Sequence, residues 1–360
     1  MSIVVSGLGV VSSLGIGVEE NLTHLYSGQS GISLCPEGIP ASKVISRTAL
    51  LGMLAVKEAI IDSQIDVSSN KTGLISSTSV GGMDLTEIFF KDYIKDNTKG
   101  DIRQVLMHDC AASTKAICNY CNINGYSTTI STACSSSANA IIKGYNLLKH
   151  GVLDAVIVGG CDALSAFTLN GFKSLMILDK ELCKPFDERR AGLNLGEGAG
   201  YIVLQREEDC NKKYCRLSGF ANTNDAFHQT ASSENGEGAY LAMNKALSMA
   251  GLYPESIDYI NAHGTGTPNN DLTESIAISR IFNQNMPLIC STKSYTGHTL
   301  AASGGIEAVF SILSIKEGFV PESLNFAVPM HNGVIPNTTL HRQEINTVLS
   351  NSFGFGGNCL

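Results

Sequence analysis

A strand, a turn of small residues and an amphipathic helix follow one another twice in this chain, and this repeat is the strongest constraint on its fold. The first copy runs from TGLISSTSVGG through the turn STACSSSANA to the strand DAVIVGG. The second runs from IDYINAHGTGT through the turn KSYTGHTLAASGG to TVLSNSFGFGG. Strands that alternate with helices in this way predict an α/β fold, here with two related halves.

The helix of each copy is predicted from apolar residues spaced three and four positions apart. In the first copy these are Ala138, Ile141, Ile142, Tyr145 and Leu148, with Gly151 as the stop. In the second they are Ile306, Val309, Phe310 and Leu313, with the stop at Gly318. The polar stretch 206–213 separates the copies, so we expect an N-terminal half over 1–205 and a C-terminal half over 206–360.

Cys134 lies where the β-branched run YSTTIST, which we expect to be a buried strand, passes into the first of these helices. The start of a helix has unpaired N–H groups and a partial positive charge, which favour a thiolate and can bind an oxyanion. This placement predicts a nucleophile. The alternative is that Cys134 is an unreactive core residue, since cysteine is one of the most buried residue types.

Two histidines follow predicted strands in turns rich in small residues. His263 stands in NAHGTGTPNND and His298 in STKSYTGHTLAASGG. Because α/β sheets build their active sites at the carboxyl ends of strands, both are candidate site residues. The other histidines lack this setting, although His228 returns below.

Composition excludes several classes of function. Cys118 and Cys121 form the one C-x-x-C pair in a helical stretch, without a second pair at zinc spacing, so we expect no metal site. A net charge of −8 without a basic run argues against a nucleic-acid partner. We expect no membrane span, and eleven cysteines favour a reducing, cytoplasmic location.

Six ordered blocks together resemble the elongating β-ketoacyl-acyl carrier protein synthases of types I and II, which belong to the thiolase superfamily. They are the opening VVSGLGVVSSLGIGVEEN, then TACSSS, KPFDERRAGLNLGEGAG, HGTGTPNND, KSYTGH and NSFGFGG. The block GFANTNDAFHQTASSENGEGA resembles a further part of the same family. The resemblance implies a thiolase-like fold, in which two duplicated α/β halves form a layered αβαβα core.

The resemblance also implies the reaction, a decarboxylative Claisen condensation of an enzyme-bound acyl group with a malonyl thioester. Cys134 would carry the acyl group, and the backbone N–H groups of Cys134 and Phe355 would form the oxyanion hole. His263 and His298, both neutral, would donate N–H groups to the enolate oxygen. Lys293 would be a supporting catalytic residue, with Glu307 as its charge partner. No metal and no cofactor are required.

Substrate contacts are carried over in the same way. Thr265 and Thr267 match positions that bind the pantetheine arm of the carrier, and His228 and Thr230 fall in the block on the malonyl side. Phe355 matches the side chain that gates the acyl pocket, with Phe353 beside it. We also expect part of this pocket to be lined by the segment 83–126.

The implied partners are acyl carrier protein, in its acyl- and malonyl-loaded forms, and a second subunit in a homodimer or in a heterodimer with a related chain. Because both the carrier and this chain are acidic, docking requires a local basic patch. The candidate cations are Lys43, Arg47, Lys184, Arg189 and Arg190. The region 33–46 is shorter than is usual in the family.

Two alternatives stay open at this point. A thiolase joins thioesters without decarboxylation and needs a second cysteine near the C-terminal glycine turn, where Cys359 follows at a different position. A chain-length-factor subunit keeps the fold but lacks the nucleophile. The sequence does not distinguish fatty acid from polyketide or polyene elongation.

Overall fold

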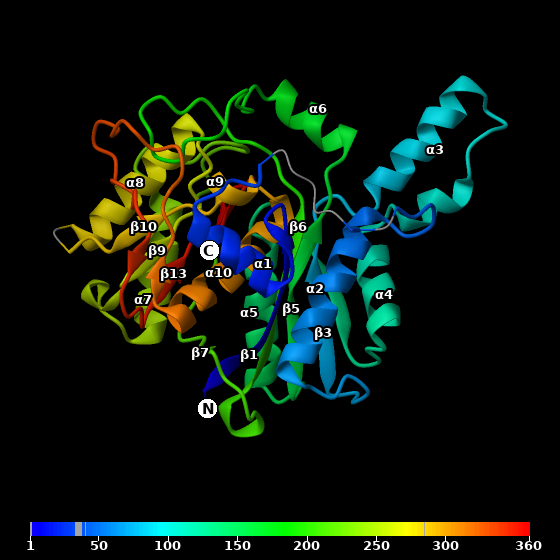
Figure 1. Ribbon diagram of the computed structural model, residues 1–360, viewed down its shortest axis with the longest axis horizontal. Helices are drawn as coiled ribbons and strands as arrows, with labels where there is room; N and C mark the ends of the chain where they lie inside the picture. The colour runs from blue at the N-terminus through cyan, green and yellow to red at the C-terminus, as the bar shows by residue number, and fades with distance from the viewer. Residues whose placement is uncertain (1, 33–37, 40, 284) are drawn as a thin grey trace.

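Helices and sheets alternate in five layers in the computed structural model of the chain (Figure 1). The structure describes residues 2–32, 38–39, 41–283 and 285–360. Part of the region 33–46, which we expect to be shortened, lies outside these ranges. The layered αβαβα fold is the one that the sequence predicts.

The first sheet has the strand order β2-β1-β6-β5-β3-β4, with β7 paired to β1. Its strands are β1 (Ile3–Ser12), β2 (Gly15–Ile16), β3 (Thr72–Ser77), β4 (Ser127–Ile130), β5 (Ala155–Asp162), β6 (Gly198–Arg206) and β7 (Cys215–Arg216). Strands β4, β3 and β5 are parallel, whereas β6 is antiparallel to both β5 and β1.

The second sheet repeats the parallel part of this plan. Strand β9 (Tyr259–Asn261) lies between β10 (Leu288–Cys290) and β13 (Val348–Ser350), all parallel, as β3 lies between β4 and β5. Beside it, β15 (Asn358–Cys359) pairs antiparallel with β14 (Phe353–Gly354) and β8 (Thr223–Asn224). A separate pair joins β11 (Phe319–Val320) and β12 (His341–Arg342). The duplication of the two halves is therefore visible in the strand order.

Helices form the other three layers. Helices α2 and α4 cover the outer face of the first sheet, α5 and α10 lie between the sheets, and α7 and α8 cover the second sheet (Figure 1). The α-helices are α1 (Val18–Ser27), α2 (Arg47–Ser63), α3 (Met83–Lys95), α4 (Cys110–Cys121), α5 (Ser136–Lys149), α6 (Ala166–Ser174), α7 (Glu237–Ala250), α8 (Pro268–Phe282), α9 (Lys293–Thr296) and α10 (Ser303–Glu317). The 3₁₀-helices are η1 (Ile102–Met107), η2 (Glu207–Asp209), η3 (Pro254–Ser256) and η4 (Leu300–Ala302).

Strand β5 shows how one sheet supports two cores. Val156 and Val158 pack in the core shared with α5 and α10, whereas Ile157 and Cys161 pack in the core under α2 and α4. Side chains alternate between the faces of a strand, so a strand that is covered on both sides is apolar throughout. Burial of each such valine or isoleucine contributes about 1.5–3 kcal/mol, so β5 is a stable central strand on which α5 packs.

The predicted helix ends agree with the structure. Helix α5 ends at Lys149 and α10 at Glu317, and the stop residues Gly151 and Gly318 have φ angles of 68° and 64°. This left-handed conformation strains residues that carry a Cβ atom, which explains glycine at both positions.

Two structural expectations are wrong. The strand before Cys134, β4, is an edge strand with partly exposed side chains, because among the residues that the structure describes it pairs with β3 alone. The segment 83–126 lines neither of the two cavities that reach Cys134. Instead α3 and η1 project from the body as an arm, and α4 covers the first sheet (Figure 1).

Candidate active site

Cys134 lies in a tight turn between β4 and α5. Ala133 before it has a φ angle of 53°, and the Ser136 side chain closes the turn by accepting from the Thr132 N–H and donating to the Ala133 carbonyl. The side chain of Cys134 is buried, with 6% exposed, but it lines a cavity on either side of the turn. The sulfur is thus shielded from bulk water and open to a bound substrate.

The protonation state of Cys134 differs from the expectation. Burial raises the pKa of the thiol to about 12, although the positive charge of Lys293 and the Cys134 backbone N–H act in the opposite direction. Loss of solvation outweighs these effects because a thiolate is poorly stabilised in an apolar interior. The expected resting thiolate is therefore wrong, and the site holds a protonated thiol.

His263 follows β9 and is held by two buried charged residues. Its backbone N–H donates to Glu274 Oε1 at 2.8 Å, and its Nδ1 lies 3.3 Å from Lys293 Nζ. Because an ammonium group can only donate, Nδ1 is the acceptor in this contact, and a neutral ring then carries its proton on Nε2.

His298 lies between α9 and η4 and has the same tautomer for a different reason. The Leu300 backbone N–H donates to His298 Nδ1 at 3.2 Å, and Ser303 Oγ lies 3.0 Å from the same atom. A backbone N–H can only donate, so the proton of the neutral ring again lies on Nε2.

Both imidazoles are neutral in the folded protein. Burial lowers the pKa of His263 and of His298 well below 6.5, and the charge of Lys293 lowers it further. The ring centres are 5.5 Å apart and the rings are nearly perpendicular. Two neutral N–H donors therefore lie side by side, as charge stabilisation at one substrate oxygen requires.

Lys293 and Glu307 form an ion pair behind His263. Their side chains are 2% and 3% exposed, and neither lines the cavities described here. Burial raises the pKa of Glu307, while the charge of Lys293 lowers it. The pair orients His263 through Nδ1 and does not face the substrate.

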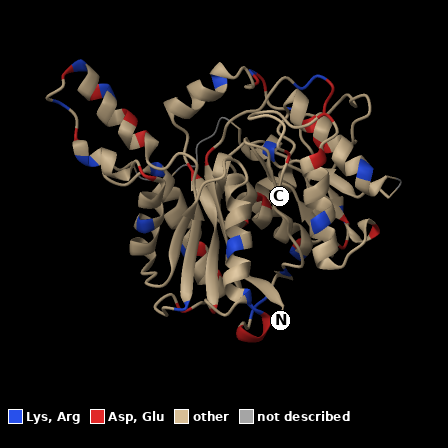
Figure 2. Ribbon diagram, turned by 180° about the vertical axis from the view of Figure 1, so that it is seen from behind, with Lys and Arg blue, Asp and Glu red and all other residues tan. Residues whose placement is uncertain are grey.

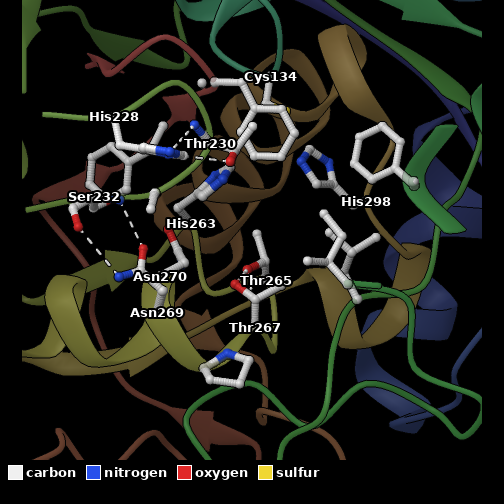
Figure 3. Close-up of a pocket in the computed structure, with 18 of the residues that line it drawn as sticks. Cys134, His228, Thr230, Ser232, His263, Thr265, Thr267, Asn269, Asn270 and His298 are labelled. Carbon is white, nitrogen blue, oxygen red and sulfur yellow. Dashed lines mark hydrogen bonds between the residues drawn. The ribbon is translucent and has the colours of Figure 1, made fainter. Parts of the chain in front are cut away.

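Nine of the side chains that the sequence predicts line one cavity of about 350 Å³ (Figure 3). They are Cys134, His228, Thr230, His263, Thr265, Thr267, His298, Phe353 and Phe355. The hydroxyls of Thr265 and Thr267 lie 2.9 Å apart, and the Thr230 backbone N–H donates to His228 Nδ1. The cavity brings together residues that are up to 221 positions apart in the chain, between Cys134 and Phe355.

A second cavity, of about 380 Å³, lies on the other side of Cys134. Its walls are mainly apolar and include Val80, Phe167 and Leu300. Cys134, Phe172 and Phe355 line both cavities, and the rings of Phe172 and Phe355 stack with centres 5.9 Å apart. This aromatic pair separates the first cavity, which has both polar and apolar walls, from the mainly apolar second cavity. We call the first the polar chamber, after its histidine and threonine side chains, and the second the apolar chamber.

Among the residues at the site that were not predicted, three contact the predicted ones directly or support them. Phe172 belongs to none of the sequence motifs, and it contacts Phe355 only because of where α6 lies in the fold. Glu274 binds the N–H groups of His263 and Gly264, and burial raises its pKa to about 7. Asp162 accepts from the Ala301 N–H beside His298. Asp162 ends β5, so an acidic residue at a strand end was an available signal, whereas Glu274 lies in the middle of α8 and had no such signal.

Cys359 also lines the main cavity. Its thiol donates to the Gly357 carbonyl, and its sulfur lies against Gly238 of α7, within the core of the second half. The charged groups that act on it are Asp225 and Glu274, whereas Lys293 and Asp162 act on Cys134. The two cysteines thus occupy different electrostatic environments.

Within the described residues, no group of three or more His, Cys, Asp or Glu side chains is arranged to hold a metal ion. Cys118 and Cys121 lie on α4, and Cys118 packs in the core under α2. Over the same residues, no helix has the length and apolar character to cross a bilayer.

Comparison with known proteins agrees with this geometry. The family described as Beta-ketoacyl synthase matches through its N-terminal domain over residues 37–210 and through its C-terminal domain over 214–327. The 3-oxoacyl-[acyl-carrier-protein] synthase 2 of Staphylococcus aureus is 31% identical, with 99% of this chain and 96% of that protein covered.

Solved structures give the same result. The ishigamide ketosynthase/chain length factor superposes with a TM-score of 0.92 at 27% identity, covering 99% of this chain and 97% of that chain. A type II PKS acyl-carrier protein in complex with its ketosynthase bound to the hexaketide gives 0.88 at 25% identity, covering 99% and 97%. The chain therefore belongs to the β-ketoacyl synthase family of thiolase-fold acyltransferases.

Proposed function

We propose that this chain is a β-ketoacyl-[acyl carrier protein] synthase that lengthens acyl chains by decarboxylative Claisen condensation. The single observation that carries this proposal is one cavity shared by the Cys134 thiol and two neutral imidazoles with their protons on Nε2. Relatives named 3-oxoacyl-[acyl-carrier-protein] synthase support the carrier-bound substrate. The pathway, fatty acid or polyketide, is left to substrate assays.

In the first half-reaction, Cys134 Sγ forms a bond to the acyl carbonyl carbon and the carrier thiol leaves. The proton of the Cys134 thiol is transferred to the sulfur of the departing carrier, so the step requires no separate base. The N–H groups of Cys134 and Phe355 would hold the tetrahedral oxyanion. Gly354 supports this arrangement, because a Cβ atom there would lie 2.8 Å from the Thr132 carbonyl oxygen.

In the second half-reaction, the malonyl thioester loses carbon dioxide and the electrons of the broken C–C bond form an enolate. The Nε2 protons of His263 and His298 would hydrogen-bond its oxygen. The enolate carbon then attacks the Cys134 thioester, and the released thiolate takes a proton from solvent. Neutral donors suit this step, since they stabilise the oxyanion without protonating the nucleophilic carbon.

The two cavities suggest where the substrates lie. The polar chamber, with Thr265, Thr267, His228 and Thr230, would take the pantetheine arm and the malonyl group. The apolar chamber beyond Phe355 would take the growing acyl chain. Cys134, the residue that is acylated, would then belong to the half 1–205. His263 and His298, which stabilise the enolate, would belong to the half 206–360.

Partners follow from the same proposal: an acyl carrier protein and a second subunit, either identical or related. The half-exposed edge strand β4 supports pairing with another chain, and so do exposed apolar residues on the arm and on α6, such as Phe90, Ile94, Leu106 and Phe167. In a solved relative, an acyl-carrier protein is bound to its ketosynthase. We place the enzyme in the cytoplasm.

A carrier-docking patch is not apparent from the cations suggested by sequence. Arg47 pairs with Glu197, Lys184 with Glu181 and Arg189 with Asp187. Figure 2 shows Lys and Arg interspersed with Asp and Glu along the ribbon seen from behind.

Intact-mass measurement tests the proposal. After incubation with acyl-carrier, Cys134→Ala should gain no acyl mass, whereas His298→Ala should be acylated and should release carbon dioxide from malonyl-carrier about a hundred- to a thousand-fold more slowly. Cys359→Ala is the matched cysteine control and should be acylated normally. Acylation of the Cys134→Ala protein would overturn the assignment.

The thiolase alternative is tested by the extender unit. Condensation with malonyl-carrier but not with acetyl-coenzyme A supports the proposal, and the reverse preference would favour a thiolase. Chain extension by the Cys134→Ala protein once a related subunit is added would identify a chain-length-factor role for this chain.

A further inference from the structure

Helix α6 forms part of the wall of both chambers, yet it buries little of its own surface. Phe172 lines both cavities, and Phe167, Thr168, Gly171 and Ser174 line the apolar chamber. Of the nine residues of α6, all of which the structure describes, Thr168 alone is buried. A helix of this length is not stable by itself in water, so its position depends on contacts with the rest of the fold.

The N-terminal end of α6 is held by side chains, most of them from other elements. From 163 to 168, five of the six backbone N–H groups donate to a side-chain oxygen. The acceptors are Thr48 for 163, Glu197 for 164, Glu87 for both 166 and 167, and Ser165 for 168. The start of α6 is thus attached to α2, to the turn before β6 and to α3, the helix of the neighbouring arm (Figure 1).

Glu87 makes the two shortest of these bonds. Its Oε1 accepts from the Phe167 N–H at 2.6 Å, and its Oε2 accepts from the Ala166 N–H at 3.0 Å. Both oxygens of one carboxylate therefore lie on the first two N–H groups of the helix, where the partial positive charge favours an anion. Because hydrogen bonds to a charged acceptor are roughly twice as strong as bonds between neutral groups, Glu87 is the main polar attachment of this end.

The root of the arm keeps Glu87 in a fixed place. Asp84, one turn earlier on α3, accepts from the Arg47 N–H at the start of α2 at 2.8 Å, and Leu85 between the two acids is buried. Gly82, directly before α3, is packed so closely that an added Cβ atom would lie 2.1 Å from the Met107 carbonyl oxygen. The first turn of α3 is therefore joined to the body, and the next carboxylate along it holds the start of α6.

We propose that Glu87 is a positioning residue that fixes α6 where Phe172 stacks on Phe355, and thereby restricts which acyl chains enter the apolar chamber. Phe172 lies about two helical turns from the N–H groups that Glu87 binds, so a shift of the helix start is passed along α6 to the ring. The ring centres are 5.9 Å apart and aromatic pairs lose contact beyond about 7 Å, so a shift of roughly 1 Å separates them. The restriction of acyl chains rests on the proposed acyl transfer to Cys134, whereas the attachment of α6 does not.

Two measurements on the 360-residue chain test the proposal. In Glu87→Gln the side chain accepts through one oxygen and carries no charge, so amide hydrogen exchange of 166–174 should become about tenfold faster. Competition among acyl-carriers from hexanoyl to hexadecanoyl, read by intact mass of acylated Cys134, should show a wider range of accepted lengths. Asp92→Asn, the matched acid-to-amide change at an exposed position farther along α3, should alter neither result.

A double variant shows whether Glu87 acts through Phe172. In Phe172→Ala the partition is already open, so adding Glu87→Gln should widen the range of acyl lengths no further, although exchange of 166–174 should still become faster. An equal change of selectivity with and without the Phe172 ring would indicate a general loss of stability and overturn the proposal. Unchanged exchange or unchanged selectivity in Glu87→Gln would overturn it as well.

The two readouts separate this proposal from the proposed reaction. If the unsubstituted protein is acylated by none of the carriers, the proposed reaction fails. Exchange of 166–174 in Glu87→Gln and Asp92→Asn then still decides whether Glu87 fixes α6, because it requires no acyl transfer.

Discussion

At the residue scale, the burial of Cys134 and its position at the start of a helix have opposite effects on the pKa of its thiol. The turn before α5 places the sulfur beside backbone N–H groups, but its 6% exposure raises the thiol pKa to about 12. A protonated resting thiol protects the enzyme from adventitious alkylation and couples attack to proton transfer onto the leaving group.

The first prediction concerns this thiol. Alkylation of Cys134 by iodoacetamide should rise about tenfold per pH unit and should still be rising at pH 9, because the thiolate fraction grows throughout this range. Peptide mapping after timed quenching measures the rate at each pH, and Cys134→Ala identifies the modified site. A plateau below pH 8 would contradict the raised pKa.

The second prediction concerns the buried pair. Lys293→Met leaves Glu307 buried without its partner and should lower the free energy of unfolding by about 3–5 kcal/mol. The double variant Lys293→Met/Glu307→Leu should recover much of this loss because no charge is left buried, yet it should remain poorly active because His263 Nδ1 has lost its donor. Urea unfolding and carbon dioxide release measure the two effects separately. A fully active double variant would show that Lys293 does not orient His263.

At the element scale, the turn that carries Cys134 depends on the strand that packs against it. Gly354 in β14 lies so close to this turn that an added Cβ atom would be 2.8 Å from Thr132 O and 2.9 Å from Ser135 Oγ. Two segments more than 200 positions apart in sequence are thereby held in one site.

The third prediction follows from this contact. Gly354→Ala should displace the Cys134 turn or the Phe355 backbone and slow Cys134 acylation by at least about tenfold, because the oxyanion donors would no longer converge. Acylation followed by intact mass gives the rate, and the Tm reports whether the fold survives. Unchanged acylation in a folded variant would show that the turn and β14 move independently.

The fourth prediction concerns the aromatic partition between the chambers, to which α6 and the C-terminal glycine turn each contribute one ring. Phe172→Ala removes a stacking contact worth about 0.5–1.5 kcal/mol and joins the apolar and polar cavities. We expect Cys134 to accept a wider range of acyl lengths and shapes, as measured by competition between acyl-carriers. Phe90→Ala, on the arm and in the lining of neither cavity, leaves the stacked pair intact and should preserve the original selectivity.

At the scale of the whole molecule, the site places several titratable groups in one dry interior. His263 and His298 are held neutral, whereas burial raises the pKa values of Asp162, Asp271 and Glu274. A lowered histidine pKa destabilises the fold as the pH falls below 6.5, because the unfolded chain then binds the proton more readily. The raised carboxyl pKa values act in the opposite direction, since they stabilise the protonated fold at low pH.

The fifth prediction isolates one histidine by a double difference. Lowering the pH from 7.5 to 5.5 should decrease the free energy of unfolding of the unsubstituted protein by about 1.4 kcal/mol more than that of His298→Asn, whose side chain cannot titrate. Urea unfolding of both proteins at both pH values gives this difference, and the carboxyl contributions cancel. Equal pH dependence of the two proteins would mean that His298 is not held neutral.

Much of this protein was predictable from local sequence. Apolar residues at helical spacing predicted α5 and α10, and the glycines that end them were placed correctly because only a left-handed residue fits there. The layered fold and the family followed from ordered motifs. The helices and their ends depend on short-range chemistry, which neighbouring residues determine. The layered fold, in contrast, was implied by the family resemblance that the motifs carry.

Other features arise only from tertiary contacts. The partial exposure of β4 and the projection of α3 depend on where these segments lie relative to the first sheet. The stacking of Phe172 on Phe355 depends on where α6 packs. The raised pKa of the Cys134 thiol and the lowered values for the histidines come from desolvation, which depends on how deeply the folded chain buries each group. The sequence therefore predicted the cysteine and the histidines of the site. Their protonation states and the lining of the cavities around them were decided by packing between distant segments.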